Sequence, residues 1–147
     1  MPDQPAPRPA ADELAGATIL VVDDNEQNLE LLLAYLDDLR CRVVTARDGV
    51  EAVEAVSRHK PDLVLLDVMM PRMSGFQACE RIKSLPEGRD VPVVMVTALN
   101  EVSDVERAVD SGADDFLTKP VNRLELLTRV RSLLRVVVTK GTGKKAD

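Results

Sequence analysis

The sequence predicts an α/β fold in which five parallel strands form a doubly wound sheet with helices on both faces. Two observations lead to this prediction. Short apolar runs of strand length alternate along the chain with longer segments whose apolar residues recur at helical spacing. Unbroken apolar runs are typical of parallel strands buried on both faces. Strands that alternate with helices favour a parallel sheet with right-handed crossovers.

The first two strands are expected at residues 18–22 and 42–45. Asn25 is a candidate N-cap for the helix between them, because an asparagine side chain accepts a hydrogen bond from a first-turn backbone N–H. The buried face of that helix is indicated by leucines at i, i+3, i+4 and i+7 spacing, namely Leu29, Leu32, Leu33 and Leu36. A second helix is expected to begin at Asp48-Gly49.

The third strand, residues 62–67, is the stretch around which the rest is organised. Its four apolar residues, 63–66, run directly into the carboxylate of Asp67. The turn signals Met70-Pro71 and Ser74-Gly75 follow, so Asp67 should lie where a central strand leaves the sheet. A third helix is expected over residues 75–85, with Phe76, Cys79 and Ile82 facing the core.

The remaining elements follow the same alternation. The fourth strand is expected at residues 91–96, the fourth helix at 101–111 with Gly112 as its C-cap, and the fifth strand at 115–118. A fifth helix should run from Asn122 to about residue 135. The chain therefore divides into a disordered Pro/Ala-rich leader (1–16), one domain (17–135) and a flexible C-terminal tail (136–147).

Composition restricts the classes of function. Hydrophobic residues make up 45% of the chain, enough for a core, whereas aromatic residues make up only 2%. The net charge of -6 argues against nucleic acid as a direct partner. Cys41 and Cys79 lack metal-ligand spacing and are expected to be buried. The chain shows neither a secretory signal nor an apolar run long enough for a bilayer, so we expect a cytoplasmic protein without a membrane partner.

Polar residues stand at the ends of four predicted strands. Because parallel strands point the same way, their ends meet at one edge of the sheet. The residues concerned are Asp23 and Asp24, Asp67, Thr97, and Lys119. Singly, each is typical of a cap, a turn or the surface. Together, three carboxylates call for a hard divalent cation such as Mg²⁺, a lysine suits a phosphoryl oxygen, and an aspartate can accept a phosphoryl group.

These residues resemble the receiver domain of bacterial two-component response regulators. The resemblance covers about residues 17–135 and implies a flavodoxin-like, three-layered fold with strand order 2-1-3-4-5. It rests on the motifs Ile19-Leu20-Val21-Val22-Asp23-Asp24-Asn25, Leu65-Leu66-Asp67-Val68-Met69-Met70-Pro71 with Ser74-Gly75, Val96-Thr97-Ala98, and Gly112-Ala113-Asp114-Asp115-Phe116-Leu117-Thr118-Lys119-Pro120.

The resemblance also implies roles for individual residues. Asp67 would be the phosphoacceptor. Asp24, Asp67 and the backbone carbonyl of Met69 would ligate Mg²⁺ directly, and Asp23 would do so mostly through a water. Lys119 would pair with phosphoryl oxygens.

A second group of residues would report the phosphorylation state. Thr97 would move toward the attached phosphate, and Phe116 would turn inward as Thr97 withdraws. The Lys119-Pro120 bond would be cis. Met69 and Leu99 are apolar where some members hold a hydrolytic water, so we hypothesise slow loss of the phosphoryl group.

The implied function is a phosphorylation-dependent switch rather than an enzyme with a released product. A histidine kinase or phosphotransfer protein would donate the phosphoryl group, and the chain would promote only its own phosphotransfer and dephosphorylation. The readout face would comprise the fourth helix, fifth strand and fifth helix, with Leu124 exposed. Opposite charges there favour a phosphorylation-dependent homodimer: Asp104, Asp110, Asp114 and Asp115 against Arg123, Arg129 and Arg131.

Three alternatives remain open. The chain could be a regulatory input domain cut from a longer output enzyme such as a diguanylate cyclase. A phosphatase of the haloacid dehalogenase type would need a second acid two residues after Asp67, where this chain has Met69. A flavin-binding module of flavodoxin type would want aromatic residues in the strand-end loops, and none is evident there.

Overall fold

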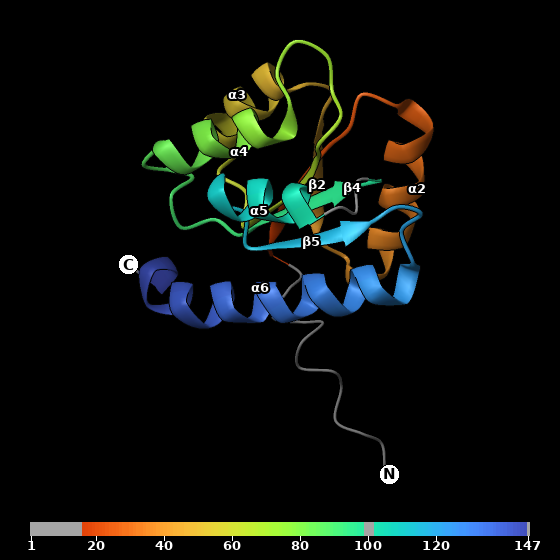
Figure 1. Cartoon of the computed structure of the whole chain (residues 1–147). Helices are drawn as coiled ribbons and strands as arrows, with labels where there is room; N and C mark the ends of the chain where they lie inside the picture. The colour runs from red at the N-terminus through yellow and green to blue at the C-terminus, as the bar shows by residue number, and fades with distance from the viewer. Residues whose placement is uncertain (1–15, 99–101, 147) are drawn as a thin grey trace.

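The computed structural model describes residues 16–98 and 102–146 and contains the predicted alternation of strands and helices (Figure 1). In chain order the elements are β1 (Thr18–Val22), α2 (Glu26–Leu36), the 3₁₀ helix η1 (Asp37–Leu39), β2 (Arg42–Ala46), α3 (Gly49–His59), β3 (Leu63–Asp67), α4 (Gly75–Ser84), β4 (Val93–Thr97), α5 (Val102–Asp110), β5 (Asp115–Thr118) and α6 (Arg123–Ala146).

The strands form one parallel sheet in the order β2-β1-β3-β4-β5, which confirms the predicted order. Helices α2 and α6 cover one face, while α3, α4 and α5 cover the other (Figure 1). The three predicted layers are therefore present. The strand order changes direction beside β1 and β3, the position at which open α/β sheets bind ligands.

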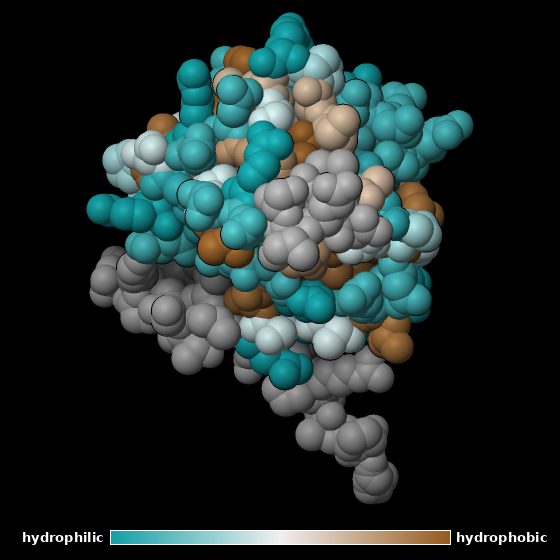
Figure 2. All heavy atoms as spheres, in the orientation of Figure 1, coloured by the Kyte–Doolittle hydropathy of each residue, from teal (hydrophilic) through white to brown (hydrophobic). Residues whose placement is uncertain are grey.

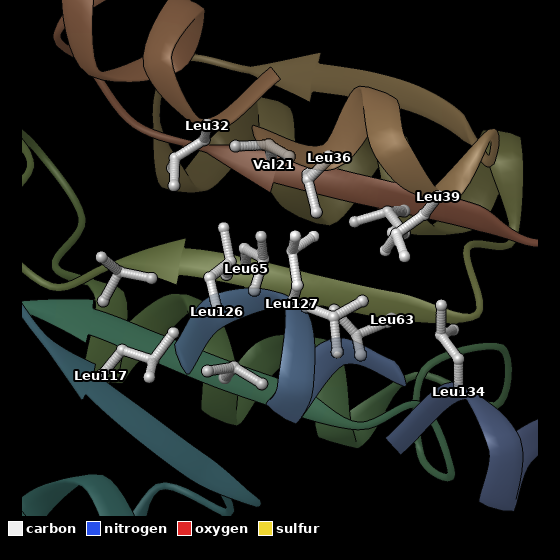
Figure 3. Close-up of a cluster of buried hydrophobic side chains, with 14 of the residues drawn as sticks. Val21, Leu32, Leu36, Leu39, Leu63, Leu65, Leu117, Leu126, Leu127 and Leu134 are labelled. Carbon is white, nitrogen blue, oxygen red and sulfur yellow. The ribbon is translucent and has the colours of Figure 1, made fainter. Parts of the chain in front are cut away.

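The sheet separates two apolar clusters. Along β1, Ile19 and Val21 face the cluster under α2 and α6, whereas Leu20 and Val22 face the other one. Successive side chains of a strand point to opposite faces, so a strand covered on both sides must be apolar throughout. Figure 3 shows Leu126 and Leu127 of α6 packed toward Leu65 of β3 in the first cluster. The inward direction predicted for Phe76, Cys79 and Ile82 is likewise confirmed.

Four of the described helices begin at side-chain caps near the carboxyl ends of strands, and the cap of α6 is Asn122, which accepts from the backbone N–H of Glu125 at 2.9 Å. Asn25 accepts a hydrogen bond from the backbone N–H of Asn28 at 2.9 Å, and Asp48 accepts one from Glu51 at 2.8 Å. Ser74 forms a capping box with Gln77. Each cap fixes the turn that leads out of the preceding strand, and these turns surround the predicted site.

The observed boundaries differ from the prediction in several places. Strand β4 begins at Val93 rather than residue 91, and α6 continues to Ala146 rather than ending near residue 135. The helix therefore extends into the segment 136–147, for which the sequence predicts a flexible tail, and the flexibility itself stays a prediction. No proline follows to stop the helix, and the glycines at 141 and 143 each cost only about 1 kcal/mol.

Some expectations lie outside the described residues. These are the leader up to residue 15, Leu99, and the side chain of Asp104. Cys79 is buried as predicted, whereas Cys41 is only half-buried; neither forms a disulfide. None of the helices in residues 16–98 and 102–146 is long and apolar enough to span a membrane.

Candidate functional site

The carboxyl edge of the sheet gathers the polar residues named from the sequence. Asp23 directly follows β1, Asp67 ends β3, Thr97 ends β4 and Lys119 directly follows β5. Pairing between β4 and β5 places Thr97 opposite Thr118, one residue before the lysine. The parallel register therefore brings together residues that lie up to 96 positions apart in the sequence.

Three carboxylates lie close enough to share one cation. Oxygen atoms of Asp23, Asp24 and Asp67 all lie within 4.8 Å of one another. The side chains of Asp23 and Asp67 are buried, with 1% and 3% of each residue exposed, whereas Asp24 is open to solvent. Oxygen ligands of this kind, with room for waters on the exposed side, fit Mg²⁺.

Lys119 supplies the positive charge of the site. Its Nζ lies 3.2 Å from Oδ1 of Asp67 and 3.5 Å from Oδ2 of Asp23. Burial lowers the pKa of Lys119, but the charges of Asp67 and Asp23 outweigh it, and the pKa is raised overall. The lysine is therefore held as a cation beside the proposed acceptor. The Lys119-Pro120 bond is cis, as predicted.

The surroundings of Asp67 work against a negative charge on its carboxylate. Burial, followed by the negative charge of Asp23, raises the pKa of Asp67, although Lys119 and the backbone N–H of Met69 oppose the rise. Desolvation and like charge both disfavour the ionised form. A bound cation would offset both effects, which is a physical reason for these residues to hold one.

Backbone hydrogen bonds orient Asp23. Its Oδ1 accepts the N–H of Asn25 at 2.9 Å, and its own N–H donates to the carbonyl of Ala46 at 3.1 Å. Asn25 in turn caps α2. The aspartate is thus held by the same turn that begins the helix.

Gly75 lets the next helix approach the acceptor strand, a role that sequence reasoning missed by treating it as a turn residue. A Cβ at this position would lie 2.3 Å from the carbonyl oxygen of Asp67 and 2.7 Å from Cα of Val68. The N–H of Gly75 donates to the carbonyl of Val68 at 2.9 Å. Only the absence of a side chain permits this contact.

The predicted switch residues lie on the two neighbouring strands β4 and β5. Thr97 is buried, with 5% exposed, and Phe116 is half-buried against the second apolar cluster. Phe116 is paired in register with Met95, two residues before Thr97. The coupled movement of Thr97 and Phe116 stays a prediction.

An apolar hollow of about 360 Å³ adjoins the site on the α2 side, and the sequence analysis did not anticipate it. Asp23 and Lys119 are the charged residues of its lining, and Leu31, which is 46% exposed, is one of the apolar ones. The remaining lining residues are Asn28, Leu32, Val96, Pro120 and Val121. Leu31 lies outside the leucine face predicted for this helix, and the residues that line the hollow with it are brought there by the fold.

The raised pKa of Asp67 leads to a prediction about stability. A carboxyl whose pKa is higher in the folded protein favours folding while it is protonated, and that contribution is lost as pH rises through the folded-state pKa. We therefore expect Asp67→Asn to raise the melting temperature of the metal-free protein at neutral pH by a few degrees. Thermal denaturation in a chelator measures this.

The same experiment carries its own controls. The advantage of the variant should disappear below about pH 4, where the carboxyl is protonated in both the folded and unfolded chain. Saturating Mg²⁺ should favour the wild type, because a cation that binds only the folded protein stabilises it. A lower melting temperature for Asp67→Asn at neutral pH without metal would contradict the electrostatic description.

Comparison with known proteins gives a consistent result. The family model described as response regulator receiver domain matches residues 19–131. The chain is 50% identical over 119 residues to the response regulator PleD of Caulobacter vibrioides, covering 81% of this chain and 26% of PleD. It is 45% identical over 117 residues to the response regulator MprA of Mycobacterium leprae, covering 80% of this chain and 50% of MprA.

Solved structures show the same likeness. The receiver domain of a signal transduction histidine kinase from Syntrophus aciditrophicus has a TM-score of 0.77 and 38% identity, over 83% of this chain and 92% of that one. The receiver domain of sensor histidine kinase PA1611 from Pseudomonas aeruginosa, solved with a magnesium ion in its active site cleft, has a TM-score of 0.76 and 34% identity, over 81% and 98% of the two chains.

Proposed function

The chain belongs to the response regulator receiver domain family, and from this premise we propose that Asp67 accepts a phosphoryl group and thereby switches a signalling surface. The observation that carries the proposal is the contact of the buried Asp67 with Lys119 at 3.2 Å, beside two further carboxylates. A nucleophile, a cation-binding set and a fixed positive charge are what phosphoryl transfer to a carboxylate requires.

In the proposed reaction, a carboxylate oxygen of Asp67 attacks phosphorus. A new P–O bond forms as the P–N bond to the imidazole of a histidine kinase or phosphotransfer protein breaks. Lys119 contacts Asp67 and Asp23 in this structure. Once the phosphoryl group is attached, Lys119 would pair with one of the phosphoryl oxygens. The protein's share of the chemistry is positioning and charge neutralisation.

Mg²⁺ would supply the remaining positive charge. Its ligands would be Asp24, Asp67 and the carbonyl of Met69, with Asp23 acting mostly through a water. The close carboxylate oxygens support this assignment, as does the magnesium ion in the structure of the PA1611 receiver domain. When bound, the cation stabilises the charge that develops on the transferring phosphoryl oxygens.

The chemistry is tested with a small phosphoryl donor. Acetyl phosphate and Mg²⁺ should add the mass of one phosphoryl group to the protein, and omission of Mg²⁺ should prevent the gain. A small phosphate ester incubated with the same protein should not be turned over, which separates this function from that of a phosphatase. Unchanged mass after incubation with acetyl phosphate and Mg²⁺ would refute the proposal.

Whether the receiver acts alone or as the input domain of a longer output enzyme, such as a diguanylate cyclase, is a separate question. The chain spans only about a quarter to a half of the length of the curated relatives it matches. That fact supports the input-domain alternative, and the reading frame around the gene would decide between the two.

We further propose that the phosphodonor protein docks on the apolar hollow beside α2, because the exposed Leu31 lines the same hollow as Lys119. Leu31→Glu should slow phosphotransfer from a protein donor by about tenfold, the effect of roughly 1.4 kcal/mol at an interface. Phosphorylation by acetyl phosphate should be unchanged, since a small donor needs no docking surface.

Leu124→Glu provides a matched control for this prediction. Leu124 is 70% exposed, as the sequence analysis expected, but lies at the start of α6, outside the hollow. It should leave both reactions at their wild-type rates. Equal rates for Leu31→Glu and wild type with a protein donor would rule out docking at the hollow.

We also propose a phosphorylation-dependent dimer through α5, β5 and α6, but with contacts that differ from those predicted from the sequence. The charges expected to pair between subunits have partners within the chain: Arg129 binds Asp115 at 2.6 Å, Arg123 pairs with Asp38, and Asp114 with Lys83. Support comes instead from two exposed apolar side chains, Val109 and Leu124, with exposed fractions of 64% and 70%. Figure 2 shows a largely hydrophilic face on which apolar residues surface in separate patches.

Light scattering tests the dimer. The protein with Mg²⁺ alone should have the mass of a monomer, and addition of beryllofluoride, which mimics the phosphoryl group on Asp67, should double it. Leu124→Arg should weaken this association, because a charge on an apolar contact must be desolvated. A monomer in beryllofluoride at high protein concentration would contradict the proposed dimer.

A further inference from the structure

The segment between β3 and α4, residues 68–74, is here called the acceptor loop. Its base is closed by the hydrogen bond from the N–H of Gly75 to the carbonyl of Val68, at 2.9 Å. One residue along, the backbone N–H of Met69 donates to the carboxylate of Asp67. The path of this loop therefore decides how the acceptor carboxylate is oriented.

The tip of the acceptor loop has an unfavourable backbone. Arg72 has φ of +68°, and the N–H of Met73 donates to the carbonyl of Pro71 at 2.7 Å across it. This is a γ-turn with a positive φ at a residue that has a side chain, a rare and strained conformation. Such strain persists only where the surrounding structure holds it in place.

The beginning of helix α3 keeps this turn in place. The guanidinium of Arg72 forms an ion pair with Asp48, the N-cap of α3. The next loop residue, Met73, packs directly against Gly49, where an added Cβ would lie 2.8 Å from its side chain. Two successive residues of the loop tip are thus fixed to the beginning of one helix.

The ion pair differs from an ordinary surface pair. The side chain of Asp48 is only 7% exposed, and its Oδ1 already caps α3, while its Oδ2 accepts a hydrogen bond from the guanidinium of Arg72, whose side chain is 73% exposed. The pair is therefore buried on the carboxylate side only, and loss of Arg72 would leave the buried charge of Asp48 without this partner. By contrast, both side chains of the pair Arg47–Glu26 are more than 60% exposed, and exposed pairs contribute little.

We propose that Arg72 is a positioning residue of the phosphoryl site: its ion pair with Asp48 holds the acceptor loop so that the backbone of Met69 is fixed beside Asp67. The strained turn at Arg72 and the hydrogen bond from Met69 to Asp67 involve only atoms of the protein itself. The consequence for cation binding rests on the proposed function, because the carbonyl of Met69 is assigned there as a ligand.

The test compares variants at both ends of the ion pair. Arg72→Ala removes the guanidinium, and Asp48→Asn removes the charge while keeping a good N-cap. In metal-free protein, each should speed hydrogen exchange of the amides of residues 68–74. Each should also weaken Mg²⁺ binding, measured by calorimetry, by about tenfold, as loss of an outer-shell partner does at metal sites.

A double variant and two further substitutions separate the causes. The double variant Asp48→Asn/Arg72→Ala should be no weaker in Mg²⁺ binding than either single one, because both remove one interaction. Arg72→Lys should recover part of the affinity by restoring the charge. Arg72→Gly relieves the positive φ, so it should unfold at a higher temperature than Arg72→Ala while binding Mg²⁺ no better.

Arg47→Ala serves as the matched control and should leave exchange and Mg²⁺ affinity unchanged. Wild-type exchange in Arg72→Ala would overturn the proposal, and so would faster exchange with unaltered Mg²⁺ affinity, because the loop would then not position the site. A wild-type protein that binds no Mg²⁺ and gains no phosphoryl group would instead refute the proposed function. The exchange measurement would still report whether Arg72 holds the loop.

Discussion

Asp67→Asn is expected to abolish the gain of a phosphoryl group from acetyl phosphate and Mg²⁺. The amide oxygen of asparagine is a poor nucleophile and cannot form the aspartyl phosphate, whereas its shape and hydrogen bonds remain close to those of the acid. Lys119 would keep its contact with Asp23 at 3.5 Å, so the site should not collapse. Intact-protein mass spectrometry gives the result directly.

The control for this variant is Asp90→Asn. Asp90 is exposed and precedes β4, at the edge of the sheet opposite the site. It should take up one phosphoryl group as the wild type does. If Asp67→Asn were phosphorylated to the same extent as Asp90→Asn, another residue would be the acceptor and the assignment of Asp67 would fall.

Gly75→Ala is expected to destabilise the protein by about 3 kcal/mol, the upper range for a side chain added to a packed region. The new Cβ would meet backbone atoms of Asp67 and Val68, which cannot rotate away as a side chain can. Helix propensity alone predicts the opposite sign, because alanine is favoured over glycine by about 1 kcal/mol inside a helix. Urea denaturation of both proteins decides between these two effects.

Gly16→Ala is the matched control, since a Cβ at Gly16 would meet no atom within 4 Å. Its unfolding midpoint should stay near that of the wild type. Gly75→Ala should also slow phosphorylation by acetyl phosphate, because relief of the overlap displaces the carbonyl end of Asp67. A midpoint equal to or above the wild-type value would show that the approach of α4 to β3 is not as tight as the structure has it.

Much of the fold and of the site followed from local patterns. The apolar runs of β1, β3 and β4 are buried along their whole length, as the sequence predicted. Because parallel strands end at one edge, placing Asp23, Asp67 and Lys119 at strand ends was enough to predict that they meet. Their closeness in the structure confirms that prediction. The strand order came from the resemblance to a family, not from the residues alone.

Other features depend on contacts between segments that are distant in the sequence, and no sequence pattern indicates that these segments meet. Arg72 and Asp48 are 24 residues apart, and nothing in their spacing indicates an ion pair. The sequence predicts partners for Arg123 and Arg129 in a second subunit, yet the fold supplies Asp38 and Asp115 within the chain. A charged side chain contacts whichever opposite charge the packing of neighbouring elements brings within reach.

The sequence by itself determined the succession of strands and helices and the chemical character of the carboxyl edge, because both arise from short-range periodicity and from the common direction of parallel strands. Only the tertiary structure decided how close α4 could come to Asp67, where Leu31 would border a hollow, and that the N-cap of α3 would hold the acceptor loop. Those features depend on the distances between packed elements, and side-chain volumes set such distances only once the elements have docked.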